Sequence, residues 1–169
     1  MEPTINRSSA PPPIAEAMPK PSDHAELLEL RRRRAELRES MGTLERELAA
    51  AAADRAVVWG ERVYEALSDL ADDFVDHIAV TEGPDGLHQA ILGGDLRLTN
   101  GVNALAADHQ VIAAEIASLI ADTQPPVSRE DVAAVRAQAT ELLGHLVRHR
   151  QRGADLIYEA YDTDIGGGD

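Results

Sequence analysis

Apolar residues recur every three to four positions along most of the chain, which is the period of amphipathic α-helices. This pattern is interrupted at the alanine run near Ala52, at the Gly93-Gly94-Asp95 turn and at the Pro125-Pro126 turn. The interruptions predict an all-α protein in which four helices form an up-and-down bundle. Because aromatic residues make up only 3% of the chain, we expect a core of Leu, Ile, Val and Ala.

The first helix is predicted to begin at Ser22-Asp23, where Glu26 completes a capping box. Its apolar stripe contains leucines and one methionine at helical spacing, with Arg34 as the exception, and it fades into the following alanines. Gly42-Thr43 is an alternative, earlier end for this helix.

The end of the second helix is ambiguous, because a turn-like segment at 81–86 is followed by further apolar residues. If the helix is kinked at Pro84 and continues to Leu92, His77 and His109 lie at the same height. If it stops at Glu82, their heights differ by several turns. The third helix is predicted to begin near Asp95, and the fourth is predicted to be opened by Ser128.

The chain ends differ in composition from this helical part. Residues 1–21 hold six of the nine prolines and predict a disordered leader, whereas residues 166–169 predict a flexible tail. The bundle is therefore expected to span residues 22–165.

The charge and the cysteine count exclude several classes of protein. A net charge of −14 argues against a nucleic-acid-binding surface. The four consecutive arginines at 31–34 lie between glutamates at 26, 29, 36 and 39 and predict a salt-bridged helix face. Without cysteine, disulfides, thiolate zinc sites and iron–sulfur clusters are excluded. Apolar runs fall short of a membrane span and no secretory signal is recognisable, so we expect a cytoplasmic protein with no membrane partner.

Five of the six histidines fall at matching distances from the helix-ending turns, so they are expected to share one layer of the bundle. His145 and His149 lie four residues apart on one helix face, a spacing that suits metal ligation. The alternative is that each is an ordinary hydrogen-bonded core residue. His88 falls outside the layer and is expected to face solvent or lie at a helix end. The predicted layer contains His24, His77, His109, His145 and His149.

Two carboxylates are candidates to complete a metal site. Glu82 follows His77 by five residues, so it shares a face with His77 only if a π-bulge forms at Pro84; the alternative is an ordinary turn. Asp155 would point inward only if the fourth helix is distorted at Gly153.

The chain contains four short motifs: Asp23-His24, Phe74-x-x-His77-x-x-x-Thr81-Glu82, Leu105-x-x-Asp108-His109 and Leu142-x-x-x-Leu146-x-x-His149. These motifs resemble those of the hemerythrin-like, or HHE cation-binding, family across about residues 22–165. The resemblance implies a non-haem di-iron centre with bridging carboxylates, which handles or senses oxygen, peroxide or nitric oxide. It also implies His24, His77, Glu82, His109 and His149 as ligands, with His145 as an addition to the family pattern.

This chain departs from the family at Gly153-Ala154, where a carboxylate is expected. A mononuclear, asymmetric or empty site is therefore the alternative to a symmetric di-iron centre. The sequence favours a cytoplasmic iron-binding protein with a small diatomic or peroxide ligand, since histidine and carboxylate ligands without cysteine suit iron. The alternative is a metal-free acidic bundle that acts as an interaction module or homodimer through coiled-coil pairing of the first helix.

Overall fold

The computed structural model describes residues 21–162, so the leader expected at 1–21, apart from Pro21, and the tail expected at 166–169 lie outside it. Within this range every regular element is a helix, which confirms the all-helical class. The elements are α1 (Pro21–Ala49), α2 (Ala56–Glu82), α3 (Leu87–Gly94), the 3-10 helix η1 (Leu96–Leu98), α4 (Thr99–Asp122) and α5 (Val132–Asp162).

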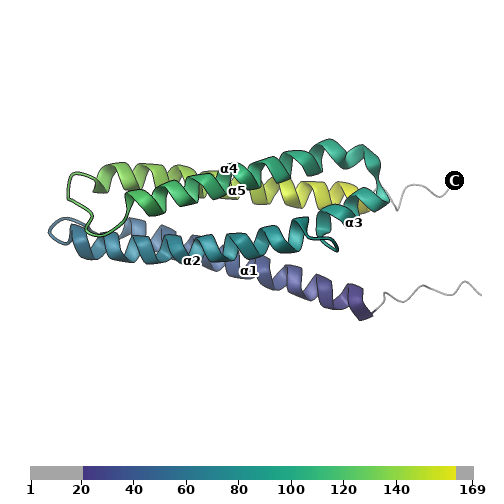
Figure 1. Ribbon diagram of the computed structural model, residues 1–169, viewed down its shortest axis with the longest axis horizontal. Helices are drawn as coiled ribbons and strands as arrows, with labels where there is room; N and C mark the ends of the chain where they lie inside the picture. Colours follow the sequence, from purple (N-terminus) through teal and green to yellow (C-terminus); the bar gives the residue numbers. More distant parts are fainter. Residues whose placement is uncertain (1–20, 163–169) are drawn as a thin grey trace, which may run out of the picture.

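The four long helices run side by side as a bundle (Figure 1). Helix α1 packs mainly against α2, and α4 packs mainly against α5, while α2 also contacts α4 and α1 also contacts α5. The short helix α3 lies at one end of the molecule, where it contacts α2, α4 and α5.

Two separate clusters of apolar side chains fill the interior. The larger cluster includes Phe74 of α2, Ile112 of α4 and Leu146 of α5. The smaller one joins α3, η1, α4 and α5, and it includes Leu105 and Leu156. Along α4 the two clusters are separated by less than two turns, and the histidine at position 109 lies between them.

Helix α2 ends at Glu82, so the continuous helix kinked at Pro84 is not formed. Proline lacks the N–H that would continue the helix. The following turn is closed by the backbone N–H of Gly86, which donates to the carbonyl oxygen of Gly83 at 2.8 Å. A Cβ at Gly86 would lie 2.6 Å from the carbonyl oxygen of Thr81, so this turn requires glycine.

Our expectation that a stop at Glu82 would separate the heights of His77 and His109 by several turns is wrong. Helix α3 runs on from the end of α2 toward the end of the molecule at which α4 begins (Figure 1). The chain therefore covers the distance that a kinked helix would have covered. His77 and His109 lie at matching heights when both are measured from the Gly93-Gly94 turn.

At the end of the bundle opposite α3, a side chain of α5 binds the end of α1. Helix α1 continues through Gly42 to its end near Ala49. There the guanidinium of Arg136 donates to the carbonyl oxygens of Leu48 at 2.8 Å and Ala50 at 3.0 Å, groups that the end of a helix leaves unpaired. The same guanidinium lies 5.3 Å from the centre of the Trp59 ring.

The salt-bridged face predicted for the arginine run is confirmed for two of its members. Arg32 and Arg33 both pair with Glu29 and Glu36 on α1. Arg33 also pairs with Asp76 and so connects α1 to α2.

One described helical stretch, Leu96–Asp122, is long and apolar enough to cross a membrane by length and composition, with a mean hydropathy of 1.3. We expected no such run from the sequence. A core helix of a soluble protein passes the same test, and α4 contacts both α2 and α5 within the bundle.

Candidate metal centre

Three of the predicted histidines converge in the interior of the bundle. His77 of α2, His109 of α4 and His149 of α5 each offer a ring nitrogen, and these nitrogens lie within 4.8 Å of one another. The Nε2 atom of His149 lies 3.1 Å from Nε2 of His109 and 3.4 Å from Nε2 of His77. The three residues are 1–6% exposed, so they form a buried cluster.

Carboxylates lie next to the outer nitrogen, Nδ1, of two of the rings. The Nδ1–H of His109 donates to Glu82, and Nδ1 of His149 lies 3.4 Å from a carboxylate oxygen of Asp108. A carboxylate in this place holds the proton on Nδ1 and leaves the Nε2 lone pair free for a metal. Two lone pairs that face each other at hydrogen-bond distance do not bond, so the donor set fits a cation placed between the rings.

His77 is the third member and its surroundings differ. Its ring stacks on Phe74 with 5.8 Å between the centroids, and its Nδ1 atom is buried without a hydrogen-bond partner among the described residues. An unsatisfied buried polar atom costs about 1–3 kcal/mol. A buried imidazole with an unsatisfied nitrogen is therefore a candidate for a functional role.

The environment keeps two of these rings neutral. Burial, followed by the nearby His109 and His149, lowers the pKa of His77 from 6.5 to about 3. Burial and His109 lower the pKa of His149 to about 4, although Asp108 opposes the shift. Since a neutral imidazole is the form that ligates metals, both rings have the required form at neutral pH.

Glu82 reaches the cluster by a different route from the one expected. Helix α2 ends at this residue without a π-bulge, and the side chain bonds to the outer nitrogen of His109 rather than joining the converging group. A side chain at a helix end has this freedom because no further turn of its own helix crowds it. Glu82 therefore contacts His109 and is not part of the three-histidine group.

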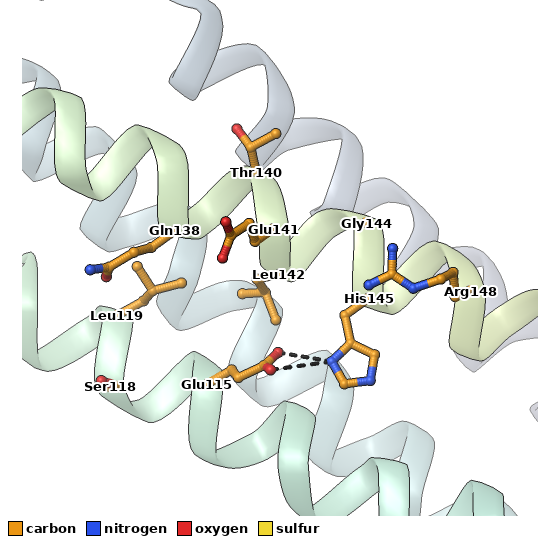
Figure 2. A pocket seen from close by; sticks show the side chains of 10 residues that line it. All are labelled: Glu115, Ser118, Leu119, Gln138, Thr140, Glu141, Leu142, Gly144, His145 and Arg148. Carbon is orange, nitrogen blue, oxygen red and sulfur yellow. Dashed lines mark hydrogen bonds and ion pairs between the residues drawn. The ribbon is translucent and has the colours of Figure 1, made fainter.

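His145 and Asp155 are not brought to the cluster. The Nδ1–H of His145 donates to Glu115 of α4 at 3.0 Å, and the ring borders a separate pocket between α4 and α5 (Figure 2). Asp155 is exposed and accepts a hydrogen bond from Gln151 at 2.8 Å. Helix α5 continues through Gly153 as α-helix, so nothing turns Asp155 inward. The side chain of His24 lies outside the described part.

Two neighbours of the cluster were missed from the sequence. His88 is the second residue of α3, which agrees with the helix-end alternative, but its side chain is buried rather than exposed to solvent. Its ring stacks on His109 with 5.8 Å between the centroids and only 5° between the planes. Ile91, three residues later, is also buried, so His88 and Ile91 lie on the same inward face of α3. The spacing of His88 and this apolar residue is visible in the sequence. Asp108 could have been found as the acidic neighbour of His109.

The chain was compared with family models, curated proteins and solved structures, and none of them matches it.

Proposed function

We propose that this protein binds a transition-metal ion through His77, His109 and His149. The observation that carries the proposal is the convergence of three buried ring nitrogens from three helices within 4.8 Å. Supporting it, the carboxylates of Glu82 and Asp108 face the outer nitrogens of two rings, as in the carboxylate–histidine pairs behind many metal ligands.

We further propose that the protein is a hemerythrin-like up-and-down bundle and that the metal is iron. Imidazole also suits zinc, copper and nickel, so the preference for iron comes from the motif resemblance. Because carboxylates stand behind the rings and Gly153-Ala154 lacks one, the arrangement favours a single ion over a symmetric pair. A bound iron ion would supply a redox-active centre for a small diatomic or peroxide ligand.

The chain's own residues prepare the site in three ways. Glu82 keeps the His109 proton on Nδ1, and Asp108 does the same for His149 at longer range. Phe74 contacts all three rings, with centroid separations of 5.8, 5.7 and 6.3 Å, and so restricts their rotation. Burial limits the access of water that would compete for the donor nitrogens.

Elemental analysis and an absorption spectrum of the purified full-length protein test the proposal. We expect iron in the wild type, and a sharply lower metal content in His77→Ala and His109→Ala. His88→Ala should retain metal because its ring nitrogens are not part of the converging group. Equal loss in all three variants would show that the site is misplaced. Absence of metal after supplementation would favour the metal-free interaction module instead.

A further inference from the structure

A cavity of about 360 Å³ lies between α1 and α5 and reaches the histidine cluster from the side. His77 and His149 form part of its wall, and three arginines, Arg34, Arg38 and Arg150, form another part. The remaining lining residues are Leu37, Val147, Gln151, Gly153 and Ala154, so no carboxylate lines it.

The three arginines have no partner among the side chains that the structure describes. No hydrogen bond or ion pair joins any of them to another such side chain, whereas their neighbours Arg32 and Arg33 are both paired with glutamates. Arg150 repels both Arg34 and Arg38 electrostatically. Such a concentration of unpaired positive charge is unexpected in a chain with 30 acidic and 16 basic residues.

An unpaired, partly buried guanidinium costs free energy unless an anion compensates it. Arg34 occupies a position in the apolar stripe of α1 and is half-buried there, although its helix offers exposed positions nearby. The guanidinium fork donates two parallel hydrogen bonds to carboxylate or phosphate oxygens. His77 adds an independent sign of an absent partner, because its buried Nδ1 is unsatisfied and its side chain borders the same cavity.

We infer that this cavity binds a small oxyanion with carboxylate or phosphate oxygens, held by Arg34, Arg38 and Arg150. The bound anion lies beside His77 and His149, so it would be a direct neighbour of the proposed metal centre. This second step rests on the proposed function, whereas anion binding does not. The volume of the cavity admits a small ion or metabolite, and the net charge of −14 opposes a nucleic-acid strand.

Isothermal titration calorimetry of the full-length purified protein at low salt tests the inference, with inorganic phosphate in one arm and succinate in the other. We expect saturable binding of at least one probe, and the tighter one identifies the anion class. Arg34→Gln and Arg150→Gln should each weaken it by about 10-fold or more, since each removes charge-assisted hydrogen bonds. The matched controls Arg31→Gln on α1 and Arg148→Gln on α5 should stay within about 2-fold of wild type.

Absence of binding by both probes, or equal binding by wild type and the Arg34 and Arg150 variants, would overturn the anion site. Circular dichroism of each variant establishes that the bundle is folded. Metal content, measured on the same samples, separates the two proposals. Metal with no arginine-dependent anion binding refutes only the anion site, and arginine-dependent binding without metal refutes only the metal centre.

Discussion

The Nε2 atoms of His109 and His149 lie 3.1 Å apart, although the outer nitrogen of each ring faces a carboxylate. With the proton of each ring on Nδ1, facing its carboxylate, the two imidazoles present acceptors to each other. In this tautomer the contact is unfavourable without a cation and favourable with one, unlike an ordinary hydrogen-bonded pair of core histidines.

One prediction contrasts two histidines that lie a turn apart on α5. His149→Ala should remove most of the bound metal, because it deletes the ring nitrogen nearest to the other two. His145→Ala should leave the metal content near that of the wild type, since this ring bonds to Glu115. Metal per chain after dialysis is the measurement. Loss in the His145 variant alone would place the site in the pocket of Figure 2.

Removing the carboxylate behind His109 should weaken metal binding without abolishing it. Glu82→Ala is expected to lower metal affinity by about 10–100-fold, because His109 then loses the partner that fixes its proton on Nδ1. Glu115→Ala removes the equivalent partner of His145 and serves as the control. Competition with a chelator of known affinity measures both. Equal effects would argue that Glu82 has no special relation to the site.

Acid should destabilise the metal-free protein over a defined pH range. His77 and His149 have pKa values of about 3 and 4 in the folded state, against an ordinary value of 6.5. Between these values the unfolded chain binds more protons, so stability is fully present above pH 6.5 and is lost as the pH falls toward 4 and 3.

Urea unfolding at several pH values from 7.5 to 4 measures this loss. Because His77→Leu removes one of the two groups, it should flatten the dependence of the free energy of unfolding on pH. An unchanged slope in this variant would show that His77 is not protonated on unfolding over this range.

Two glycines in helices should respond in opposite ways to alanine. A Cβ at Gly60 of α2 would lie 2.5 Å from the Val127 side chain, so Gly60→Ala should lower the free energy of unfolding by about 1–3 kcal/mol through overpacking. At Gly42 of α1 the nearest atom is 3.6 Å away and belongs to Arg46. Gly42→Ala should raise stability by about 0.5–1 kcal/mol, because alanine favours the helix. Thermal unfolding compares the two.

Much of the helical pattern and the convergence of three histidines could be predicted from the sequence. Helical period and turn residues place His77, His109 and His149 at one height, since the rise per residue of a helix is constant. The heights of these histidines match despite the break after Glu82, because α3 spans about the same length as the helical continuation would have done.

The remaining features depend on packing that no helical period encodes. Burial of His88 follows from the docking of α3 against α4, and the role of Glu82 follows from the freedom of a helix-terminal side chain. Asp155 was considered as an inward residue because glycine permits distortion, but the backbone at Gly153 stays helical. A residue that permits a distortion does not by itself cause one.

The position of the imidazoles between the two apolar clusters has a consequence for the dynamics of the molecule. The smaller cluster, which includes Ile91 and Leu156, is separate from the larger one and contains fewer buried side chains. It packs α3 against the start of α4. Segments supported by less buried apolar surface open more readily, so amide hydrogens of α3 should exchange faster than those near Phe74. An ion bound by histidines of α2, α4 and α5 between the two clusters would connect these helices. It should therefore slow the exchange of the α3 amide hydrogens.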